Sequence, residues 1–314
     1  MKYGDQASLC EQLRHNIEAG SKPIAFIVGS GLTCSSVPGV QWYVDKIRSD
    51  FTGEAHDRFN EKVVGPTPAE KYQQAAEFAK MNRSQDWLNR LIRLGVLQAL
   101  PGFENLPRSM IRELLDDDRV LSRIERDPSY WLLGDGVRAL GCILGTKIEE
   151  DRRGPVVTTN FDPLVEVAVR SAGNNVSTQW LGSDGKITNS DAGGAVEIVH
   201  VHGFYRNATT LNTQSQLTRP RVRLGGSIRE RLRGHYVLVC GYGGWQDCFT
   251  RALLERIRED DDLDMEISWA WHGPASTEER IATELHNFDA ISQFGGIDLN
   301  TLFPKVNQAC PAIR

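Results

Sequence analysis

The chain has 314 residues, of which 40% are hydrophobic and 25% are charged, so it can bury a sizeable core and has the composition of an ordinary globular protein. Its formal net charge of −5 does not favour direct binding of nucleic acid through bulk positive charge. The arginines between residues 219 and 233 are interpreted as a solvent-facing surface. No apolar run approaches the ~20 residues needed to cross a bilayer, and the first five residues do not resemble a secretory signal. We therefore expect a cytoplasmic protein that has no membrane partner.

The cysteine pattern argues against a structural metal site. The chain has six cysteines, and none of them forms a C-x-x-C pair of the kind that holds zinc. Cys240 lies inside an apolar run and is expected to be a buried thiol. We therefore expect no metal.

The first half of the chain is mostly helical in pattern. Residues 5–20 show the spacing of an amphipathic helix, and residues 24–28 form a continuous apolar run that is typical of a strand buried on both faces. Residues 40–150 carry helix-forming residues with charges at helical spacing. They predict helices at about 42–62, 68–80, 84–99, 107–124 and 129–147.

Strands and helices alternate after Pro155. Strands are predicted at 156–159, 176–180, 198–201, 236–240 and 265–271, with helices at 162–171 and 247–258, and the chain after about residue 296 shows no informative pattern. This alternation predicts an α/β fold, a Rossmann-like parallel sheet flanked by helices with a long inserted all-helical lobe. We expect residues 1–40 and 151–314 to form the Rossmann-like domain and residues 41–150 to form the helical insertion.

A glycine-rich turn follows the first predicted strand. Gly29, Ser30 and Gly31 come directly after the apolar run, where backbone N–H groups can approach a pyrophosphate. The spacing is not the full G-x-G-x-x-G, because Cys34 stands at the last position. A tight turn without a ligand explains this segment equally well.

Two later strand ends carry polar side chains. Asn160 and Asp162 follow the strand at 156–159, and His202 follows the strand at 198–201. Ligands bind at the carboxyl ends of strands in open α/β sheets, and a histidine there can exchange a proton near neutral pH. The alternatives are that Asn160 or Asp162 caps the next helix and that the histidine has a structural role.

A second glycine-rich turn follows the strand at 236–240. Gly241, Tyr242 and Gly243 allow close approach of a ligand, and Asp247 lies where it could cap the following helix. A simple capped turn is again the alternative. Two such turns in one sheet are harder to explain as simple turns than one.

In this order the motifs resemble the sirtuin (silent information regulator) superfamily. The run from Gly29 to Gly39, which contains Pro38, looks like the family's G-A-G-x-S…G-I-P, and Thr159 to Asp162 looks like its T-Q-N-I-D. His202 with Gly203 matches the catalytic H-G, and Gly241 to Gly243 matches the late glycine turn. The resemblance spans about residues 20–275 and implies that NAD+ is the substrate.

One departure from the sirtuin pattern indicates a particular branch of the superfamily. Classical deacylating sirtuins carry a four-cysteine zinc module between the catalytic histidine and the late glycine turn, but residues 203–239 contain no cysteine. The chain is in this respect more similar to bacterial sirtuin-like NAD+ hydrolases that act in antiphage defence. The segment Trp245–Asp247, with Gln246 at its centre, also looks like that branch.

The resemblance implies roles for individual residues. Asn160 would contact the nicotinamide ribose and orient water, Asp162 would hold the carboxamide, and His202 would act as a general base. Ser30 and the backbone at Gly29 and Gly31 would hold the pyrophosphate. The remaining residues implied to bind the dinucleotide are Thr33, Pro38, Thr159, Phe161, Gly241, Tyr242, Gly243 and Asp247.

The leading hypothesis is an NAD+ hydrolase that releases nicotinamide and ADP-ribose. The alternatives are an NAD-dependent protein deacylase or ADP-ribosyltransferase on the same fold, and a non-catalytic module that binds NAD+ or ADP-ribose. An enzyme that destroys NAD+ must be restrained in its own cell. Family analogy therefore implies regulation by homo-oligomer assembly or by a partner, such as an ATPase or a sensor protein.

Overall fold

The computed structural model describes residues 3–188, 193–206, 209–245, 247–259, 264–273, 285 and 291–312. Within them, eight strands form one sheet in the order β1-β8-β7-β6-β2-β3-β5-β4. Every neighbouring pair is parallel. The strands are β1 (Tyr3–Gly4), β2 (Ile24–Val28), β3 (Arg153–Thr158), β4 (Val176–Trp180), β5 (Val196–His200), β6 (Tyr236–Cys240), β7 (Glu266–Ala270) and β8 (Ile291–Phe294).

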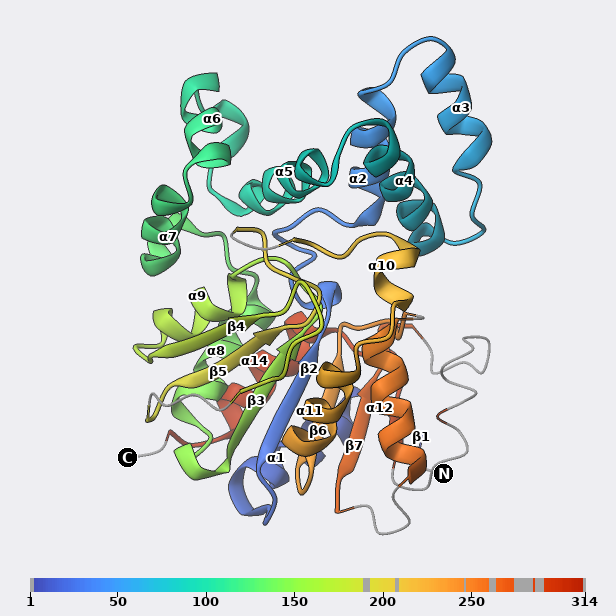
Figure 1. Cartoon of the computed structure of the whole chain (residues 1–314). Helices are drawn as coiled ribbons and strands as arrows, with labels where there is room; N and C mark the ends of the chain where they lie inside the picture. Colours follow the sequence, from blue (N-terminus) through green and yellow to red (C-terminus); the bar gives the residue numbers. More distant parts are fainter. Residues whose placement is uncertain are drawn as a thin grey trace.

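Helices cover both faces of the sheet and form a group above it (Figure 1). They are α1 (Gln6–Ala19), α2 (Val40–Ser49), α3 (Glu54–Lys62), α4 (Pro68–Asn82), α5 (Gln85–Val96), α6 (Arg108–Asp116), α7 (Asp118–Arg126), α8 (Asp135–Thr146), α9 (Leu164–Ser171), α10 (Gln214–Thr218), α11 (Val222–Leu232), α12 (Cys248–Glu259) and α14 (Leu299–Ala309). This architecture confirms the predicted Rossmann-like sheet with helical flanks. No helix among the described residues is long and apolar enough to cross a membrane.

Strand β2 shows why the sheet needs helices on both sides. Its five residues are all buried, and successive side chains of a strand point to opposite faces. Ile24, Phe26 and Val28 join a core with α1, α8, α9 and α14, whereas Ala25 and Ile27 join a core with α11 and α12. The continuous apolar run in the sequence therefore reflects burial on two faces.

Helices α2–α5 have a core of their own. Tyr43, Ile47, Phe59, Tyr72 and Leu88 belong to one apolar cluster that is separate from the two sheet cores. Local signals begin these helices: Thr67 and Glu70 form a capping box at α4, and the Ser84 side chain accepts a hydrogen bond from the Trp87 N–H at α5. In Figure 1 this group of helices, which we call the helical lobe, lies above the sheet.

Several boundaries differ from those that the sequence predicts. The single helix expected at 42–62 is two helices, because Gly53 adopts a positive φ of 56° between α2 and α3. The helix expected at 107–124 is also divided, with Asp117 beginning α7. Helix α8 lies inside the predicted insertion, yet its apolar residues belong to the core of the sheet.

The chain after residue 296 is more informative than its sequence pattern suggests. It forms α14, whose Leu302, Phe303 and Val306 are buried in the core shared with α1 and α8. The prediction that this segment is uninformative was wrong. Pro304 inside the helix obscured the pattern, and a proline normally argues against a helix interior.

Candidate functional site

The site lies at the carboxyl edge of the sheet, around its central strand. The chain passes from β2 to β3 and β5 on one side, and later to β6, β7 and β8 on the other. In open α/β sheets such a reversal of strand order leaves a crevice outside the strand ends, where ligands bind. The turns that follow β2, β3, β5 and β6 meet there.

The two glycine turns lie directly against each other. The Gly29 N–H donates to the Cys240 carbonyl at 3.1 Å, and the Gly31 N–H donates to the Gly241 carbonyl at 2.9 Å. A Cβ atom on Gly29 would lie 2.4 Å from the Gly241 oxygen, which is closer than atoms can approach. These glycines therefore allow the turns to pack. Because both amides already have acceptors, Ser30 is better placed than Gly29 or Gly31 to donate to a phosphate.

A cavity of about 210 Å³ opens where these turns meet. Asn160, Asp162 and His202 all contribute to its wall, and each side chain is at least nine-tenths buried. Most of the other residues that the sequence predicts for the site also line it: Ser30, Gly31, Thr33, Pro38, Thr159, Phe161, Gly241, Tyr242 and Gly243. Gly29 and Asp247 lie behind the wall.

Asn160 is held at three of its polar atoms. Its N–H donates to Thr158 Oγ1 at 3.0 Å, its Nδ2 donates to Thr33 Oγ1 at 3.2 Å, and its carbonyl oxygen lies 2.8 Å from His200 Nδ1. Its Oδ1 has no hydrogen-bond partner within the described part of the chain. A buried acceptor without a partner is costly, so this atom fits a ligand donor.

Asp162 shares the same threonine. Thr33 Oγ1 donates to Asp162 Oδ2 at 3.0 Å, and Asp162 Oδ1 accepts from the Leu164 N–H at 3.1 Å, at the first residue of α9. Burial raises the pKa of the Asp162 carboxyl to about 6, although these hydrogen bonds and the charge of His200 oppose the rise. The N-cap position of α9 is Pro163, and no side chain forms a capping hydrogen bond there, so neither Asn160 nor Asp162 is the cap that the sequence offered as an alternative to a ligand role.

His202 is paired with an aspartate on the late glycine turn. Its Nε2 lies 3.0 Å from Asp247 Oδ2, in a direction too bent for a good hydrogen bond. Asp247 also accepts from the Tyr242 hydroxyl at 2.8 Å and from the Thr250 N–H at 2.7 Å. Burial alone would raise the pKa of Asp247, but His202 and these donors outweigh it and lower the pKa below its usual value. The carboxylate therefore stays charged beside His202.

The helical lobe supplies part of the wall that the sequence did not reveal. Tyr43 from α2 and Tyr72 from α4 line the cavity with Trp245. The Tyr43 and Tyr72 ring centres are 5.9 Å apart, and those of Tyr72 and Trp245 are 6.2 Å apart. At helical spacing these tyrosines look like core residues, so nothing in the local pattern marked them. Gln246, which the sequence also singled out, lies outside the described residues.

A second cavity of about 340 Å³ adjoins the first. Gly31, Cys34 and the turn from Gly241 to Gly243 contribute to both walls, and the second cavity continues along the ends of β7 and β8. Its further lining includes Trp271, His272, Asp298 and Asn300. The sequence did not predict these residues, because β8 and the start of α14 were not recognised.

The described residues bring no three histidine, cysteine or carboxylate side chains into a metal-binding group. The parallel sheet with helices on both of its faces defines an α/β protein of the Rossmann-like class. Residues 155–291 match the model of the SIR2-like domain family. The match confirms the resemblance to the sirtuin superfamily, whose domains use NAD+. None of the curated proteins matches the chain.

Proposed function

We propose that this protein is an NAD+ glycohydrolase, which cleaves the bond between nicotinamide and ribose and transfers the ADP-ribose to water. The observation that carries the proposal is the convergence of Asn160, Asp162 and His202 on one cavity beside the glycine turns. The SIR2-like match over residues 155–291 supports NAD+ as the ligand. The second cavity has a suitable position for the adenosine half of the dinucleotide.

The chemistry requires positioning more than acid catalysis. When the C1′–N bond breaks, the electron pair leaves with nicotinamide, which is neutral, so no strong general acid is needed. The ribose passes through an oxocarbenium-like state, as in glycoside hydrolysis. A water oxygen then bonds to C1′ and loses a proton. The protein must hold the ribose, accept that proton and place the water.

Three side chains suit these tasks. The unpartnered Asn160 Oδ1 can accept from a ribose hydroxyl or from the attacking water. The Asp162 carboxylate can accept from the carboxamide NH₂. His202 turns Nε2 toward Asp247, which leaves Nδ1 to take a proton. Asp247 faces the other ring nitrogen, as the aspartate does in catalytic triads.

The first prediction tests this assignment. Asn160→Ala and His202→Ala should each abolish turnover, with a loss of about 100- to 10,000-fold for the general base, while the melting temperature stays near that of the wild type. Release of nicotinamide and ADP-ribose, followed by chromatography and mass, is the measurement. Met110→Ala is the control, because this side chain is exposed on α6.

Three results would overturn the proposal. Wild-type rates in both variants would show that Asn160 and His202 are not catalytic. Nicotinamide release that requires an acyl-lysine peptide would establish a deacylase, and tight NAD+ binding without product would establish a binding module. A role in antiphage defence through NAD+ depletion in the cytoplasm is part of the proposal and rests on the family resemblance. Regulation by self-assembly or by an ATPase or sensor partner rests on the same family resemblance. Assays over a range of protein concentrations would test self-assembly.

A further inference from the structure

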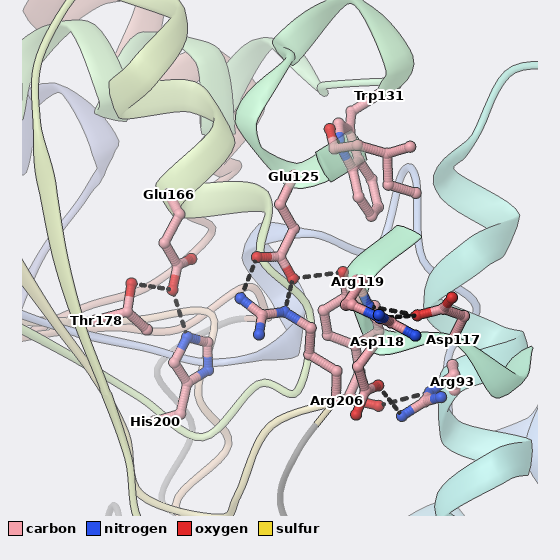
Figure 2. A network of polar contacts seen from close by, with 12 residues as sticks. Arg93, Asp117, Asp118, Arg119, Glu125, Trp131, Glu166, Thr178, His200 and Arg206 are labelled. Carbon is pink, nitrogen blue, oxygen red and sulfur yellow. Dashed lines mark hydrogen bonds and ion pairs between the residues drawn. The ribbon is translucent and has the colours of Figure 1, made fainter. Parts of the chain in front are cut away.

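A second histidine lies behind the cavity and is fully buried. His200 at the end of β5 has 0% exposure. Its Nδ1 lies 2.8 Å from the Asn160 carbonyl oxygen, and its Nε2 lies 2.7 Å from Glu166 Oε1 on α9. Figure 2 shows the ring facing Glu166, which also contacts Thr178. The ring therefore bridges a carboxylate and the backbone of a site residue.

The proton on Nδ1 follows from the partner it faces. A carbonyl oxygen can only accept, so Nδ1 must donate to Asn160. Burial opposes a charge on the ring, but Glu166 and the hydrogen bonds outweigh it and raise the pKa of His200. Both nitrogens then donate, one to Glu166 and one to the Asn160 backbone.

Asn160 is the residue whose geometry this bridge controls. With its N–H, carbonyl and Nδ2 all engaged, its Oδ1 is the polar atom left for a ligand. The His200 contact joins the Asn160 carbonyl to the neighbouring strand β5, whereas the Thr159 N–H on one side donates to Val28 and the Phe161 carbonyl on the other accepts from the Tyr205 N–H. Small displacements of groups that position a substrate slow the reaction strongly, since a shift of about 1 Å can lower the rate by about 100-fold.

We propose that His200 is a positioning residue for the reaction, which holds Asn160 in place through its Nδ1–H while Glu166 orients the ring. The inference rests on the proposed function for its effect on turnover. It assigns a role in the site to the first histidine of the H-x-H-G segment, whereas the resemblance assigns one to the second alone.

A neighbouring buried network provides the control. Glu125 accepts from the Tyr205 hydroxyl at 2.5 Å and from two nitrogens of Arg206 at 2.6 and 2.7 Å. Glu125 is buried, as the His200 pair is, and lies near it in Figure 2, but none of these three residues lines the cavity. Glu125→Gln should lower stability and leave the rate per folded molecule unchanged.

Two substitutions separate the two contacts of the ring. In His200→Asn the amide nitrogen can take the place of Nδ1 and keep the donor to Asn160, but Glu166 loses its charged partner and keeps only the long contact with Thr178. In His200→Gln the amide nitrogen can take the place of Nε2 and keep the donor to Glu166. The Asn160 carbonyl oxygen then loses its hydrogen-bond donor. Both variants remove the ring and its charge, so they differ chiefly in which contact remains.

We expect His200→Asn to keep most of the activity and His200→Gln to lose about 100-fold in kcat/KM. Thermal stability should follow the opposite order, because a buried carboxylate without a partner is costly. A purely structural role would make activity follow stability. Equal losses in the two variants, or full activity in His200→Gln, would overturn the inference.

A double-mutant cycle completes the test. If His200 acts through Asn160, adding His200→Gln to Asn160→Ala should cause no further loss of NAD+ affinity, since the two effects are not independent. Calorimetry measures this affinity without any turnover, and we expect about tenfold weaker binding for His200→Gln alone. An inactive wild type that binds NAD+ would therefore refute the hydrolase alone. A wild type that neither binds nor cleaves NAD+ would overturn both proposals.

Discussion

At the scale of one residue, the buried carboxyl of Asp162 shows how a group in the site can lower the stability of the folded protein. Its carboxyl is buried, and its pKa is raised from the ordinary 3.8 to about 6. The folded state therefore holds the proton more tightly than the unfolded state does. Stability falls as the pH rises through this window, and the loss persists above pH 6. The ionised form is retained although it destabilises the fold, which fits an acceptor for a ligand amide.

Asp162→Asn should accordingly stabilise the protein and weaken NAD+ binding. The amide oxygen of asparagine can still accept from the Leu164 N–H at the start of α9, but the amide group cannot ionise. At about 1.4 kcal/mol per pKa unit, the gain at pH 8 should be on the order of 2–3 kcal/mol. It should shrink toward zero as the pH falls to 4, where the wild-type carboxyl is protonated. Urea unfolding at pH 8 and at pH 4 measures the gain in stability. An equal gain at the two pH values would contradict the explanation by ionisation of Asp162.

At the scale of elements, the contact between the two glycine turns brings β2 and β6 into one site. A Cβ on Gly31 would lie 2.8 Å from Gly241 Cα, whereas a Cβ on Gly39 would meet no atom within 4 Å. Both glycines line the cavity. Gly31→Ala should therefore separate the turns, with a loss of about 1–3 kcal/mol and weaker NAD+ binding.

Gly39→Ala is the matched control for this prediction. Its φ of −75° suits alanine, and a Cβ there meets no atom within 4 Å, so the expected loss is the weaker N-cap preference of alanine, about 1 kcal/mol or less. NAD+ affinity should therefore stay near the wild-type value, and the loss of stability should be smaller than for Gly31→Ala. Similar effects of the two substitutions would show that the close packing of the turns does not matter.

At the scale of the whole molecule, the helical lobe is fastened to the segment that follows His202. Tyr72 on α4 donates to Asn212 Oδ1 at 2.5 Å, and Asn89 on α5 accepts from the Thr210 N–H and hydroxyl. The Leu211 N–H in turn donates to the His202 carbonyl at 2.8 Å. The lobe therefore supports the strand end that carries the proposed base, in addition to supplying Tyr43 and Tyr72 to the wall.

Tyr72→Phe should loosen both sides of this connection. It leaves the buried Asn212 oxygen without its donor, which costs about 1–3 kcal/mol. Amide hydrogen exchange should rise together in α4 and in residues 209–213. Tyr130→Phe is the control, since that ring is 52% exposed. Faster exchange in α4 alone would show that the lobe and this segment are not coupled.

The sequence alone determined the polar strand ends of this protein and the sheet apart from β1 and β8. Runs such as residues 24–28 are apolar at every position because both faces are covered, and that pattern is local. Parallel strands end at one edge of a sheet, so Ser30, Asn160 and His202 could be expected near one another before any coordinates. The glycine turns were visible for the same reason, because the need for close approach acts on single positions.

Only the tertiary structure decided which residues surround those strand ends. Tyr43 and Tyr72 have the spacing of ordinary core positions, and they become a cavity wall because the lobe lies over the sheet. Asp247 could be expected as a helix cap, but its contact with His202 joins residues from two different strand ends. Likewise, His200 meets Glu166 and Asn160 only after β5, β3 and α9 have packed. Such contacts depend on long-range packing, and the periodicity of a sequence reports only on which face of its own element a residue lies.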